Sequence, residues 1–97
     1  MRIALVCAAV LAAAPLVAVA QDAGRDLAAS CAMCHGTDGR SVGGNEPLAG
    51  VAKADIVRKF NDFRSGAKPA TIMHQISKGY TDQQIDQIAA YFSAQKR

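Results

Sequence analysis

The sequence is poor in the side chains that build metal clusters. Its 97 residues include three cysteines (Cys7, Cys31 and Cys34) and two histidines (His35 and His74). A structural zinc site of the common kind needs two Cys/His pairs. Outside the group at 31–35 the chain offers only Cys7 and His74, which lie far apart in the sequence. The second pair is therefore missing, and this class of metal site is excluded.

Several larger patterns are also absent. From residue 21 onward we find no strand candidate, no internal repeat and no low-complexity stretch. A dithiol redox site of the thioredoxin type is expected beside βαβ units, so this interpretation of the cysteines loses its context. There is no dense basic run, which argues against nucleic-acid binding. Basic residues exceed acidic ones by four within 40–80, which indicates either a solvated surface or a weakly basic docking face.

The one long apolar run lies at the N-terminus. A short positive start precedes the nearly unbroken apolar stretch 3–16, and an A-x-A pattern at 18–20 predicts cleavage before Gln21. We therefore expect a secretory signal peptide at 1–20, a single domain at 21–97 and a periplasmic location. The run is marginal for a bilayer span and lacks stop-transfer charges, so we expect no membrane anchor. Cys7 falls inside the discarded peptide, and its position does not suit lipidation.

The central motif is the pentapeptide Cys31-Ala-Met-Cys34-His35. C-x-x-C-H is the attachment pattern of a c-type haem. Thiols three residues apart reach the vinyl groups along one porphyrin edge, and the histidine that follows becomes the proximal iron ligand. We expect one covalent haem c, bound through Cys31 and Cys34, with His35 on the metal. A 77-residue domain buries only a small hydrophobic core. A covalently bound haem would stabilise it by adding an apolar surface on which the helices pack.

Apolar spacing predicts an all-α fold of about four helices. We expect a first helix over 22–30, an amphipathic helix over 53–64 that Ser65-Gly66 ends, and a short segment over 70–78. Thr81 and Gln84 form a capping box that begins the last helix. Its predicted apolar stripe consists of Ile85, Ile88, Ala89 and Phe92.

Residues 36–50 hold five glycines and are predicted to form a loop beside the cofactor. Pro47 lies near its end. We expect Pro47 to pack against His35 and its carbonyl to accept the Nδ1 proton of that ring. A hydrogen bond of this kind orients a metal-bound imidazole and raises its basicity.

The second axial ligand is approached by elimination. The candidates are Met33, Met73, His74 and the lysines. Met33 lies between the two attachment cysteines and cannot cross the ring plane. Met73, 38 residues beyond His35, is far enough along the chain to wrap round to the other face. Met73 is favoured and His74 is its rival; a thioether ligand would raise the reduction potential.

Together these stretches resemble a small class I cytochrome c. The resemblance rests on the C-x-x-C-H-G motif, on the run 47–50, on the Met73 segment and on the terminal helix with Ala89-Ala-Tyr-Phe92. The stretches 63–73 and 77–80 are more narrowly similar to the cytochrome subunit of flavocytochrome c sulfide dehydrogenase. The resemblance implies an all-α fold wrapped on one haem, with Met73 as distal ligand. It also implies that the first and last helices cross near Gly24 and Tyr91. We also expect Pro47 and Tyr80 to contact the cofactor.

The function we expect is one-electron transfer, because an iron ligated on both faces has no open position for a substrate. By itself such a chain is not an enzyme. The expected partner is the flavoprotein subunit of a periplasmic sulfide dehydrogenase. One alternative is a free shuttle that serves a terminal oxidase or another redox enzyme, and another is a haem enzyme or gas sensor with an open distal face. The expected docking rim comprises Val42, Leu48, Ile72 and Tyr80, with Lys68 and Lys78 at its edge.

Overall fold

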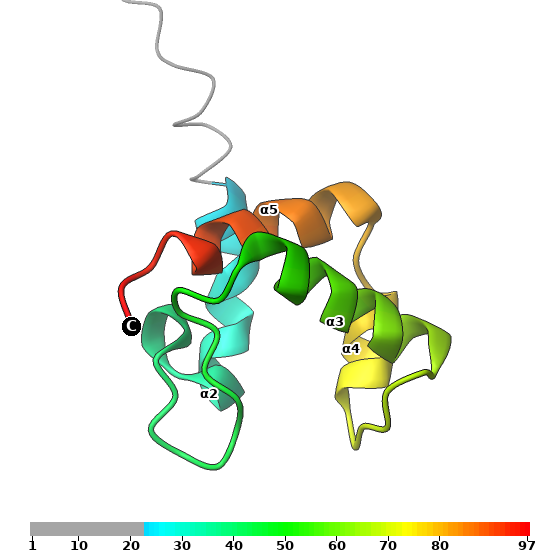
Figure 1. Cartoon of the computed structure of the whole chain (residues 1–97). Helices are drawn as coiled ribbons and strands as arrows, with labels where there is room; N and C mark the ends of the chain where they lie inside the picture. The colour runs from blue at the N-terminus through cyan, green and yellow to red at the C-terminus, as the bar shows by residue number, and fades with distance from the viewer. Residues whose placement is uncertain (1–22) are drawn as a thin grey trace, which may run out of the picture.

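A computed structural model describes residues 23–97, and these residues are helical with no strand among them. The predicted signal peptide at 1–20 lies outside the described residues. In chain order the elements are a helical segment at 23–28, η1 (Ala29–Cys31), α2 (Ala32–His35), η2 (Thr37–Gly39), α3 (Lys53–Ser65), α4 (Met73–Lys78) and α5 (Asp82–Ser93). In Figure 1, α3 and α5 lie across the upper part, and α2 and α4 lie below them on opposite sides. The all-α prediction is confirmed.

The helix ends follow local sequence chemistry. The Gln84 N–H donates to the Thr81 hydroxyl at 3.1 Å, and the Thr81 N–H donates to the Gln84 side chain at 2.9 Å, which confirms the capping box. Helix α3 ends at Gly66, whose φ of 82° is left-handed and therefore favours glycine. Within the predicted segment 70–78, only Met73–Lys78 is helical. Residues 70–72 precede the helix and line the cavity described below.

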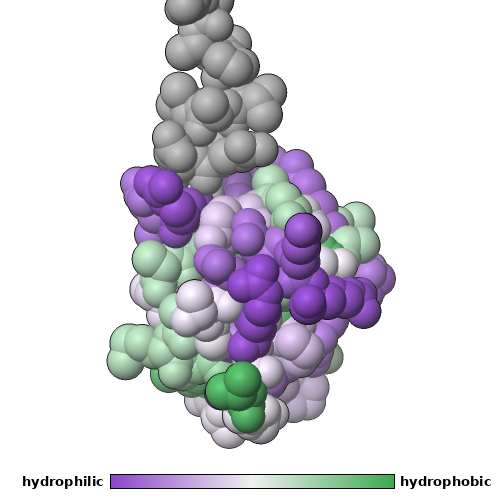
Figure 2. All heavy atoms as spheres, turned by 90° about the vertical axis from the view of Figure 1, so that its left-hand side faces the viewer, coloured by the Kyte–Doolittle hydropathy of each residue, from purple (hydrophilic) through white to green (hydrophobic). Residues whose placement is uncertain are grey.

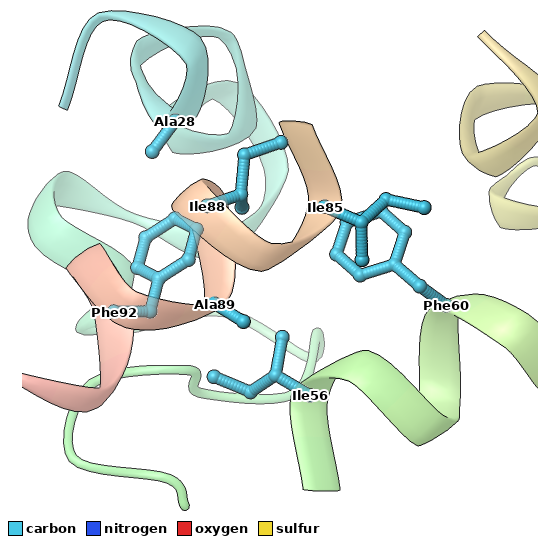
Figure 3. Close-up of a cluster of buried hydrophobic side chains, with 7 residues drawn as sticks. All are labelled: Ala28, Ile56, Phe60, Ile85, Ile88, Ala89 and Phe92. Atoms are coloured by element: carbon cyan, nitrogen blue, oxygen red, sulfur yellow. The ribbon is translucent and has the colours of Figure 1, made fainter. Parts of the chain in front are cut away.

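The hydrophobic core lies between α3, α5 and the first helical segment (Figure 3). Helix α5 presents the predicted stripe, and Ile88 and Ala89 are completely buried. Each buried isoleucine or phenylalanine side chain contributes about 1.5–3 kcal/mol through loss of contact with water. The core therefore locks α3 against α5. Its members are Ala28, Ile56, Phe60, Ile85, Ile88, Ala89 and Phe92.

The first helical segment crosses α5 at Gly24. A Cβ atom added there would lie 2.5 Å from the Gln87 carbonyl oxygen and 3.2 Å from the Tyr91 Cβ. No side chain fits at that distance, so a glycine is required for the two backbones to approach. The predicted crossing is confirmed. It brings the chain that leads into Cys31 directly onto the last helix.

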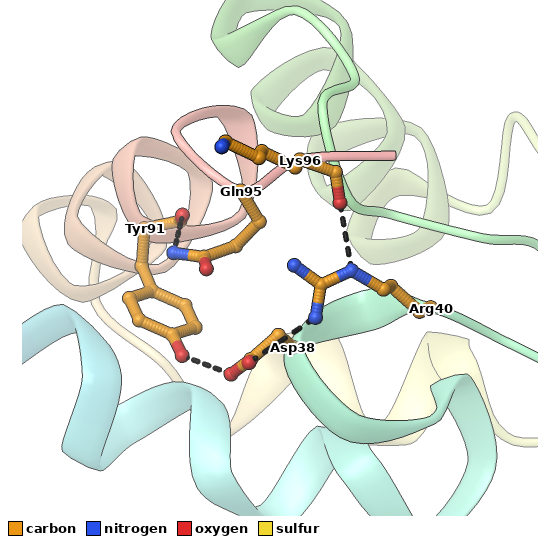
Figure 4. A network of polar contacts seen from close by, with 5 residues as sticks. All are labelled: Asp38, Arg40, Tyr91, Gln95 and Lys96. Atoms are coloured by element: carbon orange, nitrogen blue, oxygen red, sulfur yellow. Dashed lines mark hydrogen bonds and ion pairs between the residues drawn. The ribbon is translucent and has the colours of Figure 1, made fainter.

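A polar network ties the loop after the C-x-x-C-H motif to the C-terminal end of the chain (Figure 4). The Tyr91 hydroxyl donates to the Asp38 carboxylate, and Arg40 Nε donates to the Lys96 carbonyl oxygen at 2.8 Å. Arg40 also approaches Asp38, at 3.5 Å. Asp38 itself has a left-handed φ of 53°, an uncommon conformation for a residue other than glycine. These contacts hold the strained turn in place. The hydrogen bond to the Asp38 carboxylate is the main cause that raises the pKa of Tyr91.

Replacement of Tyr91 by Phe isolates this hydrogen bond, because the ring is kept. We expect Tyr91→Phe to lower the free energy of unfolding by about 1 kcal/mol near neutral pH. The folded-state pKa of Tyr91 is raised above 10.0, so the stabilisation is fully present below pH 10 and is lost as pH rises through that higher value. Denaturant unfolding of both proteins should therefore converge at high pH. A difference that does not change with pH would contradict this assignment.

Candidate haem site

A cavity of about 820 Å³ opens between α2, α3, α4 and the loop before Leu48. This volume is in the range of ordinary cofactor and ligand sites. Its apolar wall comes mainly from two helices, with Phe60 and Phe63 on α3 and Ile72, Met73 and Ile76 on or just before α4. Both aromatic residues of α3 thus line the cavity, and Phe60 also belongs to the core, as an apolar cofactor packed on a thin core requires.

The C-x-x-C-H motif forms part of the cavity wall. Cys31 ends η1, and Cys34 and His35 lie in α2; all three line the cavity, and both thiols are free. Burial is the main cause that raises the pKa of Cys31, so it is a neutral thiol rather than the low-pKa thiolate of a dithiol redox centre. Met33, between the two cysteines, is 92% exposed and does not line the cavity.

A short hydrogen bond orients His35. Its Nδ1 lies 2.6 Å from the carbonyl oxygen of Glu46, and Asn45 Nδ2 donates to the Cys34 carbonyl at 2.9 Å. The carbonyl accepts, so Nδ1 carries a proton, and in the neutral imidazole Nε2 keeps a free lone pair. This arrangement suits a metal ligand, whose second nitrogen usually donates to an oxygen.

The acceptor differs from the predicted one. We expected the carbonyl of Pro47, and the structure places the carbonyl of Glu46 there. The Leu48 N–H donates to the Gly39 carbonyl at 2.8 Å, and this register brings the carbonyl one residue before Pro47 to the ring. Pro47 is exposed and does not line the cavity, so its predicted packing against the cofactor gains no support from this geometry.

Two candidate distal ligands are separated by the helix geometry of α4. Met73 lines the cavity and packs on the edge of the core. His74 does not line the cavity, and its Nδ1 is buried without a hydrogen-bond partner in the described part of the chain. Successive residues of a helix point about 100° apart, so the two side chains face different surroundings. Met73 thus brings a thioether to the α4 side of the cavity, while α2 carries His35 on the other side (Figure 1).

The lysines on the cavity wall have other partners. Lys59 Nζ forms an ion pair with the Glu46 carboxylate, and this hydrogen bond is the main cause that lowers the pKa of Glu46. Lys68 Nζ lies 5.2 Å from the centre of the Phe63 ring, a cation–π distance. Both lysines are therefore engaged as ammonium ions, which have no lone pair for a metal. Among the candidates, the thioether of Met73 is the group that suits a distal ligand.

The predicted docking rim is mostly at the cavity. Leu48, Ile72 and Tyr80 line it, and the Tyr80 hydroxyl lies 3.4 Å from Ser30 Oγ. Val42 is fully exposed but does not line the cavity. The cavity wall also contains four residues that were not predicted from the sequence: Asn45, Glu46, Lys59 and Ile76. Of these four, only Glu46 could have been suspected from the sequence, because it directly precedes Pro47, the predicted acceptor residue.

The donors therefore fit a covalently attached haem. Two thiols and an imidazole with a free Nε2 occupy one side, a thioether occupies the other, and the walls between them are apolar. No cluster of three or more His, Cys, Asp or Glu that would suit a different metal centre occurs within 23–97. In the same range no helix has the length and apolar character that a membrane span requires.

Comparison with known proteins supports the same assignment. A family model described as cytochrome c matches residues 21–96. The cytochrome subunit of sulfide dehydrogenase from Chlorobaculum tepidum is 40% identical over 74 residues, which cover 76% of this chain and 67% of that protein. A cytochrome c4 from Pseudomonas aeruginosa is 37% identical over 75 residues, 76% of this chain but only 37% of the relative.

A third relative has a similar length. Cytochrome c-554(548) of Halomonas halodenitrificans is 33% identical over 78 residues, which cover 76% of this chain and 94% of that protein. The chain thus spans well under half of the cytochrome c4 but nearly all of this smaller protein. With the family model matching almost all of 21–97, the chain belongs to the cytochrome c family, whose members carry covalently bound haem c and transfer electrons.

Proposed function

We propose that the chain is a periplasmic carrier of single electrons, with haem c attached through Cys31 and Cys34 and ligated by His35 and Met73. The observation that carries the proposal is the shared cavity, in which an imidazole with a free Nε2 and a thioether belong to different walls. When bound, the haem supplies reversible one-electron chemistry at its iron.

The residues of the chain set the conditions for that chemistry. His35 is held by the Glu46 carbonyl, and Met73 is held at the edge of the core, so both donors are positioned before the cofactor is present. If His35 and Met73 both ligate the iron, they leave no coordination position open for a substrate or a gas. This distinguishes the carrier from a haem enzyme or sensor. A methionine ligand also favours a higher reduction potential than a second histidine would.

We further propose that the partner is the flavoprotein subunit of a sulfide dehydrogenase. The relative from Chlorobaculum tepidum, of which the chain matches 67%, bears the name of such a cytochrome subunit. Ile72 and Ile76 line the cavity and remain 53% and 38% exposed. Lys68 lines the same cavity and Lys78 ends α4. Apolar atoms bordered by charge are typical of a stable interface.

The first prediction of the proposed function concerns attachment. The mature protein should consist of residues 21–97 plus one haem, because Cys31 and Cys34 are the only cysteines left after cleavage before Gln21. Intact-mass measurement after denaturation checks both the cleavage site and the covalent bonds. Haem that extracts into acidic organic solvent would contradict the assignment.

The second prediction concerns ligation. Met73→Leu should abolish the weak far-red absorption of an iron–thioether bond, lower the reduction potential, and let the reduced protein bind carbon monoxide. The matched control is His74→Leu, one residue along α4 and off the cavity, which should leave all three properties unchanged. If the His74 variant loses the ligand signature and the Met73 variant keeps it, the ligand assignment is wrong. A wild-type protein that binds carbon monoxide rapidly would favour the gas sensor.

The third prediction concerns docking, and it uses two exposed apolar residues. Ile72→Ser should weaken a complex with the flavoprotein subunit, because it removes apolar area at the cavity mouth. Val42→Ser is the control, since Val42 is fully exposed yet away from the cavity. Figure 2 shows the face on the left of Figure 1, with hydrophilic side chains across its middle and an isolated hydrophobic group at its lower edge.

Size-exclusion chromatography of the mixture at low and high salt is the measurement. A subunit should co-elute at both salt concentrations, because apolar contacts are insensitive to screening. Electron transfer without co-elution, lost as salt rises, would instead identify a free shuttle guided by charge.

A further inference from the structure

The loop that carries the hydrogen-bond acceptor of His35 has few contacts of its own. Val42 is fully exposed, and a Cβ atom added at Gly43 or Gly44 would meet nothing within 4 Å. Two residues later the same loop places the Glu46 carbonyl 2.6 Å from His35 Nδ1. Residues 42–44 do not hold this part of the loop against the ring, so its position depends on residues 45–48, of which the Leu48 N–H donates to the Gly39 carbonyl at 2.8 Å.

The side chain of Glu46 makes the connection to a rigid element. Its carboxylate forms an ion pair with Lys59 Nζ, 13 residues further along the chain. Lys59 lies in α3 directly before the core residue Phe60 and three residues after the core residue Ile56, and its side chain is only 26% exposed. The ammonium therefore belongs to a helix that packs into the hydrophobic core. Asn45 adds a second tie, to the Cys34 carbonyl.

We propose that Lys59 is a positioning residue for His35, because its ion pair with Glu46 holds that residue's backbone carbonyl against the imidazole Nδ1–H. The proposal rests on the proposed role of His35 as a haem ligand. A strong Nδ1–H···O=C bond makes the imidazole a better electron donor and so stabilises the oxidised metal. A weaker bond should raise the reduction potential.

The charges of the pair also act through space, and variants can separate the two effects. Loss of the Lys59 charge alone favours the oxidised form, and loss of the Glu46 charge alone favours the reduced form. In the double variant Lys59→Met with Glu46→Gln the two charge effects cancel, while the backbone carbonyl remains. Positioning predicts a higher potential for the double variant. Through-space charge alone predicts the wild-type potential.

A second measurement reports on the hydrogen bond directly. Solvent exchange of the His35 Nδ1 proton, followed by NMR on the intact haem protein, should be up to about fivefold faster in Lys59→Met and in Glu46→Gln, the factor expected for loss of a partly exposed ion pair. Lys59→Arg keeps the ion pair and should restore the wild-type rate.

The matched control lies on the same helix. Lys53, at the start of α3, pairs with Asp86 at 3.0 Å and does not line the cavity. Lys53→Met removes the same charge from α3 and should leave the exchange rate of His35 Nδ1 unchanged. The double variant could show the wild-type reduction potential and the wild-type exchange rate, with the His35 ring signals still shifted by the iron. This result would overturn the positioning role of Lys59 and leave the ligation by His35 standing. Absence of iron-shifted His35 signals in the wild type would overturn the proposed ligation itself.

Discussion

The packing of α3 against α5 is the contact on which the rest of the structure depends. Ile56 and Phe60 meet the α5 stripe in a core of seven buried residues, which is small for a domain that must also hold a large cofactor. The same α3 residues continue into the cavity, because Ile56 and Phe60 line it as well. One helix thus serves both the protein core and the cofactor surface. Removal of the haem would expose the cavity side of this thin layer.

Polar contacts extend that rigid layer to the haem-attachment motif from two sides. From α5, the Tyr91 hydroxyl holds Asp38, three residues after His35. From α3, Lys59 holds Glu46, whose backbone carbonyl meets the His35 ring. The motif itself spans the last residue of η1 and the short helix α2, and neither element contains a buried residue. Its geometry is therefore imposed by the two longer helices, and this explains why charged residues recur around an otherwise apolar site.

The surface around the cavity mouth combines apolar and charged residues. The cavity mouth on the α4 side exposes Ile72 and Ile76, with Lys68 on the same wall and Lys78 at the end of α4. Electron transfer needs close approach to the cofactor edge and no chemistry on a bound substrate. A small apolar contact area with nearby charge meets that need for a stable subunit or for a transient partner, and the two differ in how much apolar area they bury.

Features set by neighbours in the chain could be predicted from the sequence. The capping box at Thr81, the α5 stripe, the end of α3 at Gly66 and the attachment motif each depend on residues within a few positions, and the Gly24 crossing accompanied the family resemblance. The tertiary structure alone decided the contacts between distant segments. Glu46 rather than Pro47 meets His35 across 11 residues, and Tyr91 meets Asp38 across 53. Local propensity carries no information about such pairs, because they form only after α3 and α5 have packed and have brought the loops to one another.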